Sequence, residues 1–90
     1  MGSDDMKIFE NIINHKIHTI TATELLKYSK QFKIPINDGE AETLAKHLNS
    51  KKINIFNPNE RAQLIRELAT ITSPATAKEV NNLFNLFANQ

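Results

Sequence analysis

Apolar residues recur every three or four positions through most of this chain, and this spacing predicts α-helices rather than strands. The predicted fold class is all-α, a compact bundle of about five short helices. The helical segments are residues 7–16, 21–32 and 37–49, followed by helices that begin at Asn57 and at Ser73.

Polar residues that cap helices stand at four of these five starts. Two pairs have the spacing of a capping box, in which the N-cap side chain and the third helical residue each satisfy a free backbone N–H group. In the other two, a polar residue precedes a proline, which is favoured at the first helical position. The four starts are Thr21 with Glu24, Asn37 with Glu40, Asn57 before Pro58, and Ser73 before Pro74.

Two segments between the helices alternate apolar and polar residues. Ile17–Ile20 is rich in β-branched residues, and Lys51–Phe56 places Ile53 and Ile55 on one side. This pattern favours extended backbone. We therefore expect two short extended crossings, which can pair as a minimal antiparallel ladder.

Short helices are marginal alone, so packing of their apolar faces must hold the fold together. We expect a core made of the large apolar residues that point inward in these helices and crossings. They are Ile12, Ile20, Leu25, Phe32, Leu44, Leu48, Ile55, Leu64, Leu68, Phe84 and Phe87.

The ninety residues are 40% apolar, which suits one domain, expected over residues 6–90. Met1–Asp5 precede a natural start at Met6 and are expected to be an added or disordered extension. There is no cysteine, which excludes disulfides and thiolate metal sites. No apolar run is long enough to cross a bilayer and no secretory signal is visible, so we expect a cytoplasmic location and no membrane partner.

The helix–crossing–helix order of the two halves resembles a paired EF-hand domain. Thr19–Leu25 looks like the exit of a calcium loop, with Asn54–Asn57 as its counterpart. An EF-hand loop needs oxygen ligands at six fixed positions and glycine at the sixth. Centring the loops on Ile20 or Ile55 places isoleucine, leucine, lysine or phenylalanine at several ligand positions and no glycine. We therefore expect no calcium binding.

Residues 22–48 also resemble the helix–extended–helix of SAP-type DNA-binding modules, through Leu25-Leu26, Ile34-Pro35-Ile36 and the leucines that follow. Asp38, Glu40 and Glu42 occupy the turn that should contact phosphate, so the match implies fold more than function.

From residue 6 onward the chain resembles a small family of uncharacterised proteins from Bacillus-like bacteria, a domain of unknown function. The residues that carry this resemblance are Thr19-Ile20-Thr21, Glu24–Tyr28, Ile34-Pro35-Ile36, Ile53–Phe56, Asn59-Glu60-Arg61, Ile71-Thr72 and Thr76–Asn81.

Candidate catalytic chemistry is sparse. His15 and His18 are three residues apart, but the first helix is expected to end near Lys16 and no third ligand is evident, so we expect no metal site. Glu24, Glu40 and Glu60 are each explained by helix capping. No serine has a histidine partner. We therefore expect a protein that is not an enzyme and that needs no cofactor.

Lysines form the one candidate nucleic-acid surface. Lys27, Lys30 and Lys33 advance along the second helix, and Lys51 and Lys52 follow the third. The formal net charge is only +1, and no arginine interleaves with these lysines. A small helical nucleic-acid-binding module is the alternative function.

The last helix carries a wide apolar surface flanked by asparagines. Val80, Leu83, Phe84 and Phe87 are expected to face the core, and Leu83, Leu86 and Phe87 are the candidate partner-binding residues. The predicted function is therefore a non-enzymatic protein-interaction module with an unknown protein partner, either monomeric or a weak homodimer.

Overall fold

The computed structural model describes the backbone of residues 2–88 and the side chains of residues 7–86. This part of the chain forms five α-helices and no strand, which confirms the all-α prediction. The helices are α1 (Gly2–Thr19), α2 (Ala22–Gln31), α3 (Asp38–Ser50), α4 (Pro58–Ile71) and α5 (Pro74–Ala88). None of these helices is both long enough and apolar enough to cross a membrane.

The predicted caps define the helix starts. Thr21 and Asn37 each form a complete capping box with the glutamate three residues later. The Asn57 side chain accepts hydrogen bonds from two N–H groups in the first turn of α4. Ser73 Oγ accepts from the backbone N–H of Thr76 at 3.1 Å, so the fourth start signal is also used.

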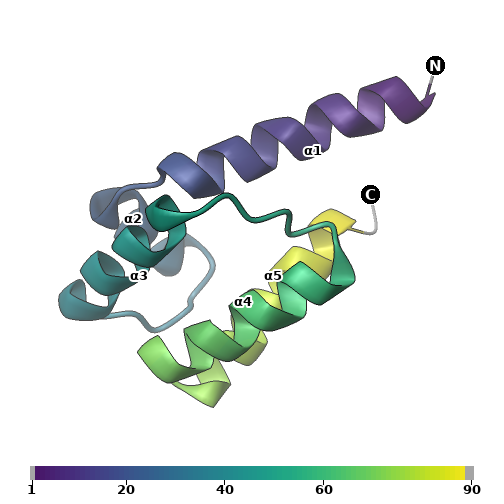
Figure 1. The fold of residues 1–90 in the computed structure, drawn as a ribbon. Helices are drawn as coiled ribbons and strands as arrows, with labels where there is room; N and C mark the ends of the chain where they lie inside the picture. The colour runs from purple at the N-terminus through teal and green to yellow at the C-terminus, as the bar shows by residue number, and fades with distance from the viewer. Residues whose placement is uncertain (1, 89–90) are drawn as a thin grey trace.

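The helix α3 lies between the other elements and holds the molecule together. α1 and α2 pack on α3, α4 packs on α3, and α5 packs on α4. Figure 1 shows α4 and α5 side by side as a hairpin, while the N-terminal half of α1 extends past α2 and α3. The molecule is elongated, with extents of 42 × 24 × 22 Å.

The predicted extended crossings are wrong in part. α1 continues through residues 17–19, so this part of the first crossing is helical. At its other end, α1 also includes residues 2–5, which the sequence analysis places outside the domain. Residues 51–57 are irregular rather than a strand. Ile55 N donates to Asn14 Oδ1 at 3.1 Å, so a side chain of α1 accepts the hydrogen bond of a backbone N–H group in this segment. Within the described residues no ladder forms.

The buried core lies where α3, α4 and the irregular segment meet. Its members include Ile20, Leu44, Leu48, Ile53, Ile55, Leu64, Leu68 and Ala77. Most of the predicted core is confirmed, although Leu25 and Phe84 are only half-buried. Ile12 and Phe32, which the sequence predicts to be in the core, are instead 61% and 47% exposed. Phe87 lies outside the described side chains.

Candidate functional site: an apolar cleft between α1, α2 and α5

A cleft of about 320 Å³ separates α1 and α2 from α5. Ile13 and Ile17 of α1, Tyr28 of α2 and Phe32 at the C-cap of α2 line one side, and Leu83 of α5 lines the other. Nearly all of this lining is apolar. Pockets of this size and character are typical binding sites.

The cleft exists because α5 packs on one neighbour only. No backbone of α5 described here closely approaches α1 or α2, although all three helices present apolar side chains toward the same space. Leu44, Leu48 and Leu68, which are buried, form the floor. Ile13, Ile17, Tyr28 and Leu83 in the walls are half-buried, and Phe32 is exposed. The result is an open cleft with an apolar floor.

One end of the cleft is tied by a long-range hydrogen bond. Thr76 is 3% exposed, and its Oγ1 donates to the backbone carbonyl of Pro35 at 3.3 Å. This bond holds the start of α5 against the segment between α2 and α3. The Thr76 hydroxyl is therefore engaged within the chain. Its hydrogen bond positions α5 rather than offering a polar group to a ligand.

Two polar side chains that line the cleft, Ser29 and Lys16, are engaged within the chain. Ser29 Oγ donates to the carbonyl of Leu26 at 2.7 Å. Lys16, which lines the cleft, forms an ion pair with Glu24. The hydrogen bond from Lys16, and next the one from the Thr21 backbone, lower the pKa of Glu24, while the Glu24 hydrogen bond raises the pKa of Lys16. Both groups stay charged at neutral pH and offset one another.

The predicted partner-binding residues Leu83 and Leu86 differ in whether they line this cleft. Leu83 is half-buried and lines it. Leu86 is 64% exposed and is not among the lining residues. Phe87 lies outside the described side chains. Sequence periodicity singled out the helix that carries Leu83, but it did not indicate the opposing wall, because Ile13, Tyr28 and Phe32 are distant from that helix in sequence.

The lysines of α2 lie away from the cleft. Leu25, Tyr28 and Phe32 face the cleft at helical spacing, which turns Lys27 and Lys30 toward the opposite, exposed side of the helix. Lys27 Nζ lies 6.0 Å from the centroid of the Tyr28 ring. Lys33 follows the end of the helix and is also exposed.

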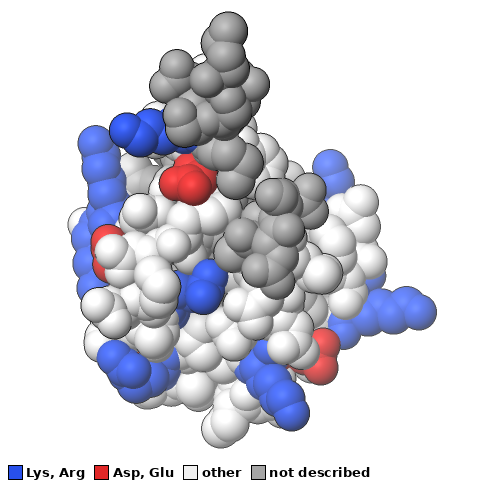
Figure 2. Space-filling model, turned by 90° about the vertical axis from the view of Figure 1, so that its right-hand side faces the viewer, with Lys and Arg blue, Asp and Glu red and all other residues white. Residues whose placement is uncertain are grey.

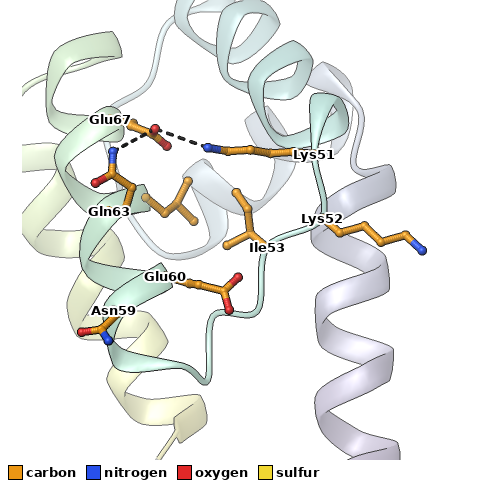
Figure 3. Close-up of a pocket in the computed structure, with 8 residues that line it drawn as sticks. Lys51, Lys52, Ile53, Asn59, Glu60, Gln63 and Glu67 are labelled. Atoms are coloured by element: carbon orange, nitrogen blue, oxygen red, sulfur yellow. Dashed lines mark hydrogen bonds and ion pairs between the residues drawn. The ribbon is translucent and has the colours of Figure 1, made fainter.

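A second, shallower pocket of about 250 Å³ lies between α4 and the segment after α3 (Figure 3). Lys51 Nζ lies 3.5 Å from Glu67 Oε2, and Gln63 donates to the same oxygen at 3.1 Å. His47 Nε2 lies 2.7 Å from Glu67 Oε1. We call these four residues the Glu67 cluster. The contact with His47, and then the Gln63 hydrogen bond, lower the pKa of Glu67.

The Glu67 cluster bears on the nucleic-acid alternative. Lys51 is paired with Glu67, and Glu60 lines the same pocket as Lys51 and Lys52. These carboxylates offset the positive charge that phosphate would need. On the face shown in Figure 2 the Lys and Arg side chains are dispersed, with uncharged residues between them.

Comparison with known proteins places the chain in a family. Residues 6–88 match a family model described as a protein of unknown function, DUF2624. The chain belongs to this family. An uncharacterized Bacillus subtilis protein, YqfT, is 43% identical over 84 residues, covering 93% of this chain and 100% of YqfT. No solved structure matches the chain. The predicted relationship to an uncharacterised family from Bacillus-like bacteria is confirmed.

The histidines of this DUF2624 member occupy three different environments. His15 is exposed, His18 Nδ1 lies 3.3 Å from the carbonyl oxygen of Leu48, and His47 belongs to the Glu67 cluster. The expectation that α1 ends near Lys16 is wrong, so both His15 and His18 are helical. Among the described residues no group of three metal-ligating side chains comes together.

Two of the three glutamates predicted as capping residues act as such. Glu24 and Glu40 accept hydrogen bonds from the N-cap backbone of their own helix. Glu60 instead accepts from the backbone N–H of Asn54 at 3.0 Å and so fixes the segment before α4. All three carboxylates therefore hold helix starts in place.

Proposed function

We propose that this protein is a non-enzymatic interaction module of the bacterial cytoplasm that binds the apolar face of a helix in its cleft. The observation that carries the proposal is the open cleft between α1, α2 and α5, whose walls are apolar and incompletely buried. Helix-in-groove binding uses such a surface, and each large apolar side chain that becomes fully buried contributes about 1.5–3 kcal/mol.

The size and chemistry of the cleft support a helix over a polar small molecule. An apolar cavity of about 150 Å³ holds one benzene ring, so the volume here suits roughly two large side chains. Sites for small polar ligands present a few polar groups that fix orientation. Ser29 and Lys16 are instead engaged with Leu26 and Glu24, which leaves mainly apolar contacts to offer.

The titratable groups with clearly shifted pKa values also favour binding over catalysis. The pKa of Glu24 and that of Glu67 are both lowered by hydrogen bonds from neighbouring cations or amides. A general base or acid working near neutral pH needs a carboxylate pKa that is raised. Hydrogen bonds that join neighbouring helices or cap a helix account for these shifts.

The alternative function, nucleic-acid binding, receives less support from this arrangement. Lys27 and Lys30 lie on the outer side of α2, whereas Lys51 and Lys52 share a pocket with Glu60 and Glu67. A single continuous basic track would need these lysines on one face without intervening carboxylates.

Photocrosslinking from the cleft tests the proposed function. Phe32 lines the cleft and is 47% exposed, so the photoreactive analogue p-benzoylphenylalanine fits there with little disturbance. We expect irradiation in a Bacillus extract to join this position covalently to one discrete protein chain. The additional substitution Leu83→Asp should abolish the product, because it places a charge on the opposite wall.

The matched control carries the same analogue at Lys46, which is exposed on the side of α3 away from the cleft. Circular dichroism checks that each variant keeps its helices. Equal products from positions 32 and 46, or no product from either, would contradict the proposal.

A further inference from the structure

Two large apolar side chains lie exposed on the protruding part of α1. Ile8 is 58% and Ile12 is 61% exposed, and they are one helical turn apart on the same side. The inward side of the same helix is occupied differently, since Phe9 packs edge-on against Phe56 with ring centroids 6.1 Å apart and Ile13 lines the cleft. Ile8 and Ile12 therefore form a separate apolar ridge.

This ridge matches the cleft in approximate volume and in apolar character. The cleft suits roughly two large apolar side chains by the benzene comparison, and the ridge offers two. Neither Ile8 nor Ile12 is among the residues that line the cleft of their own chain. A helix that presents isoleucines at this spacing is the form of ligand that an apolar groove binds.

Electrostatics do not oppose association of two copies. The formal net charge is +1, and the ion pair of Lys16 and Glu24 neutralises the charge at the cleft. The asparagines of α5, which include Asn81, Asn82 and Asn85, are uncharged. Like-charge repulsion, which commonly prevents self-association, is therefore weak here.

We propose that the cleft binds α1 of a second copy of this chain, with Ile8 and Ile12 inserted between α2 and α5. This inference rests on the proposed function and names the helix. Because α1 carries the ridge and also lines the cleft, a twofold axis lets each copy insert its ridge into the other. The contact is then reciprocal and closes as a dimer.

Sedimentation velocity of the full chain over a concentration series tests the pairing. We expect a monomer–dimer equilibrium for the unmodified chain, and at least about a tenfold weaker dimer for Ile12→Glu, which puts a charge on the ridge. Asn11→Glu adds the same charge to the neighbouring exposed position and should change the dissociation constant by no more than about twofold. Equal effects of the two substitutions would overturn the proposal.

Mixing two impaired variants tests that ridge and cleft are the complementary surfaces. Phe32→Glu alters the cleft and keeps the ridge, whereas Ile12→Glu does the reverse. Each variant alone should be monomeric at concentrations where the mixture forms a heterodimer through one intact contact. Failure of the mixture to associate, with both variants folded by circular dichroism, would overturn the pairing.

The crosslinking experiment separates this inference from the proposed function. With the analogue at position 32, a product of twice the chain mass in purified protein supports the second copy as occupant. A product with a different protein, together with a chain that stays monomeric throughout the series, overturns the second-copy inference and leaves the proposed function standing. Absence of any product overturns both.

Discussion

Lys33 adopts a left-handed backbone conformation, with φ at 58°, directly after the C-cap residue of α2, Phe32. Ile34 N donates to the Ser29 carbonyl at 2.8 Å, and Lys33 N donates to the Lys30 carbonyl at 3.4 Å. These two bonds form a Schellman motif, in which the left-handed position is usually glycine. Pro35 gives a sequence signal that the helix must end, but nothing marks Lys33 as left-handed, because lysine has no preference for that conformation.

Glycine at this position should stabilise the protein. We expect Lys33→Gly to raise the free energy of unfolding by about 1 kcal/mol, because glycine avoids the Cβ strain of a positive φ. Lys30→Gly, three residues earlier and inside α2, should lower it by about 1 kcal/mol because glycine disfavours a helix interior. Urea unfolding followed by circular dichroism measures both free energies. Changes of the same sign in the two variants would contradict a strained left-handed conformation at Lys33.

At the scale of the element, α1 shows how a distant contact overrides local propensity. The β-branched segment after Lys16 favours extended backbone, yet the helix continues to Thr19. Asn49 Nδ2 donates to the carbonyls of His18 at 2.7 Å and Ile20 at 3.1 Å, and so satisfies groups at the helix end. Asn49 is about thirty positions away, so no local window of sequence contains this information.

The Asn14 side chain plays a similar part for the segment between α3 and α4. Its Oδ1 accepts from Ile55 N, and its Nδ2 donates to Asn54 Oδ1 at 2.9 Å. We expect Asn14→Ala to lower the free energy of unfolding by about 1–3 kcal/mol, since a part-buried N–H group loses its acceptor. Thermal and urea unfolding give the value.

The control for this prediction is Asn11→Ala, an exposed position one turn earlier on α1. It should change the free energy of unfolding by no more than about 0.5 kcal/mol. If the two alanine variants were equally stable, the hydrogen bonds from Asn14 to residues 54 and 55 would contribute nothing to the free energy of unfolding.

At the scale of the whole molecule, the contact between α3 and α4 joins the α4–α5 hairpin to the other three helices. The Glu67 cluster spans that contact, with His47 on α3 and Glu67 on α4. Because Glu67 has a lowered pKa in the folded state, it contributes stability above its unfolded pKa of about 4.3. That contribution is lost as the pH falls from there through the lower folded pKa.

Removing this carboxylate should therefore matter at neutral pH and not in acid. We expect Glu67→Gln to lower the free energy of unfolding by up to about 1 kcal/mol at pH 7, with the difference from the unmodified chain shrinking toward pH 3. Urea unfolding at both values measures it, with Glu42→Gln as an exposed control on α3. If Glu67→Gln changed the free energy of unfolding equally at pH 7 and pH 3, ionisation of Glu67 would not contribute to the contact between α3 and α4.

The amino-acid sequence by itself determined the number of helices, most of their starts and much of the core. These depend on side chains three or four residues apart, such as Thr21 with Glu24 or Leu44 with Leu48, which any helix brings together. Only the tertiary structure decided that Ile12 and Phe32 remain exposed and that α5 stands apart from α1 and α2. Periodicity identifies an apolar face, but whether that face is covered depends on helix packing between residues that are far apart in the chain.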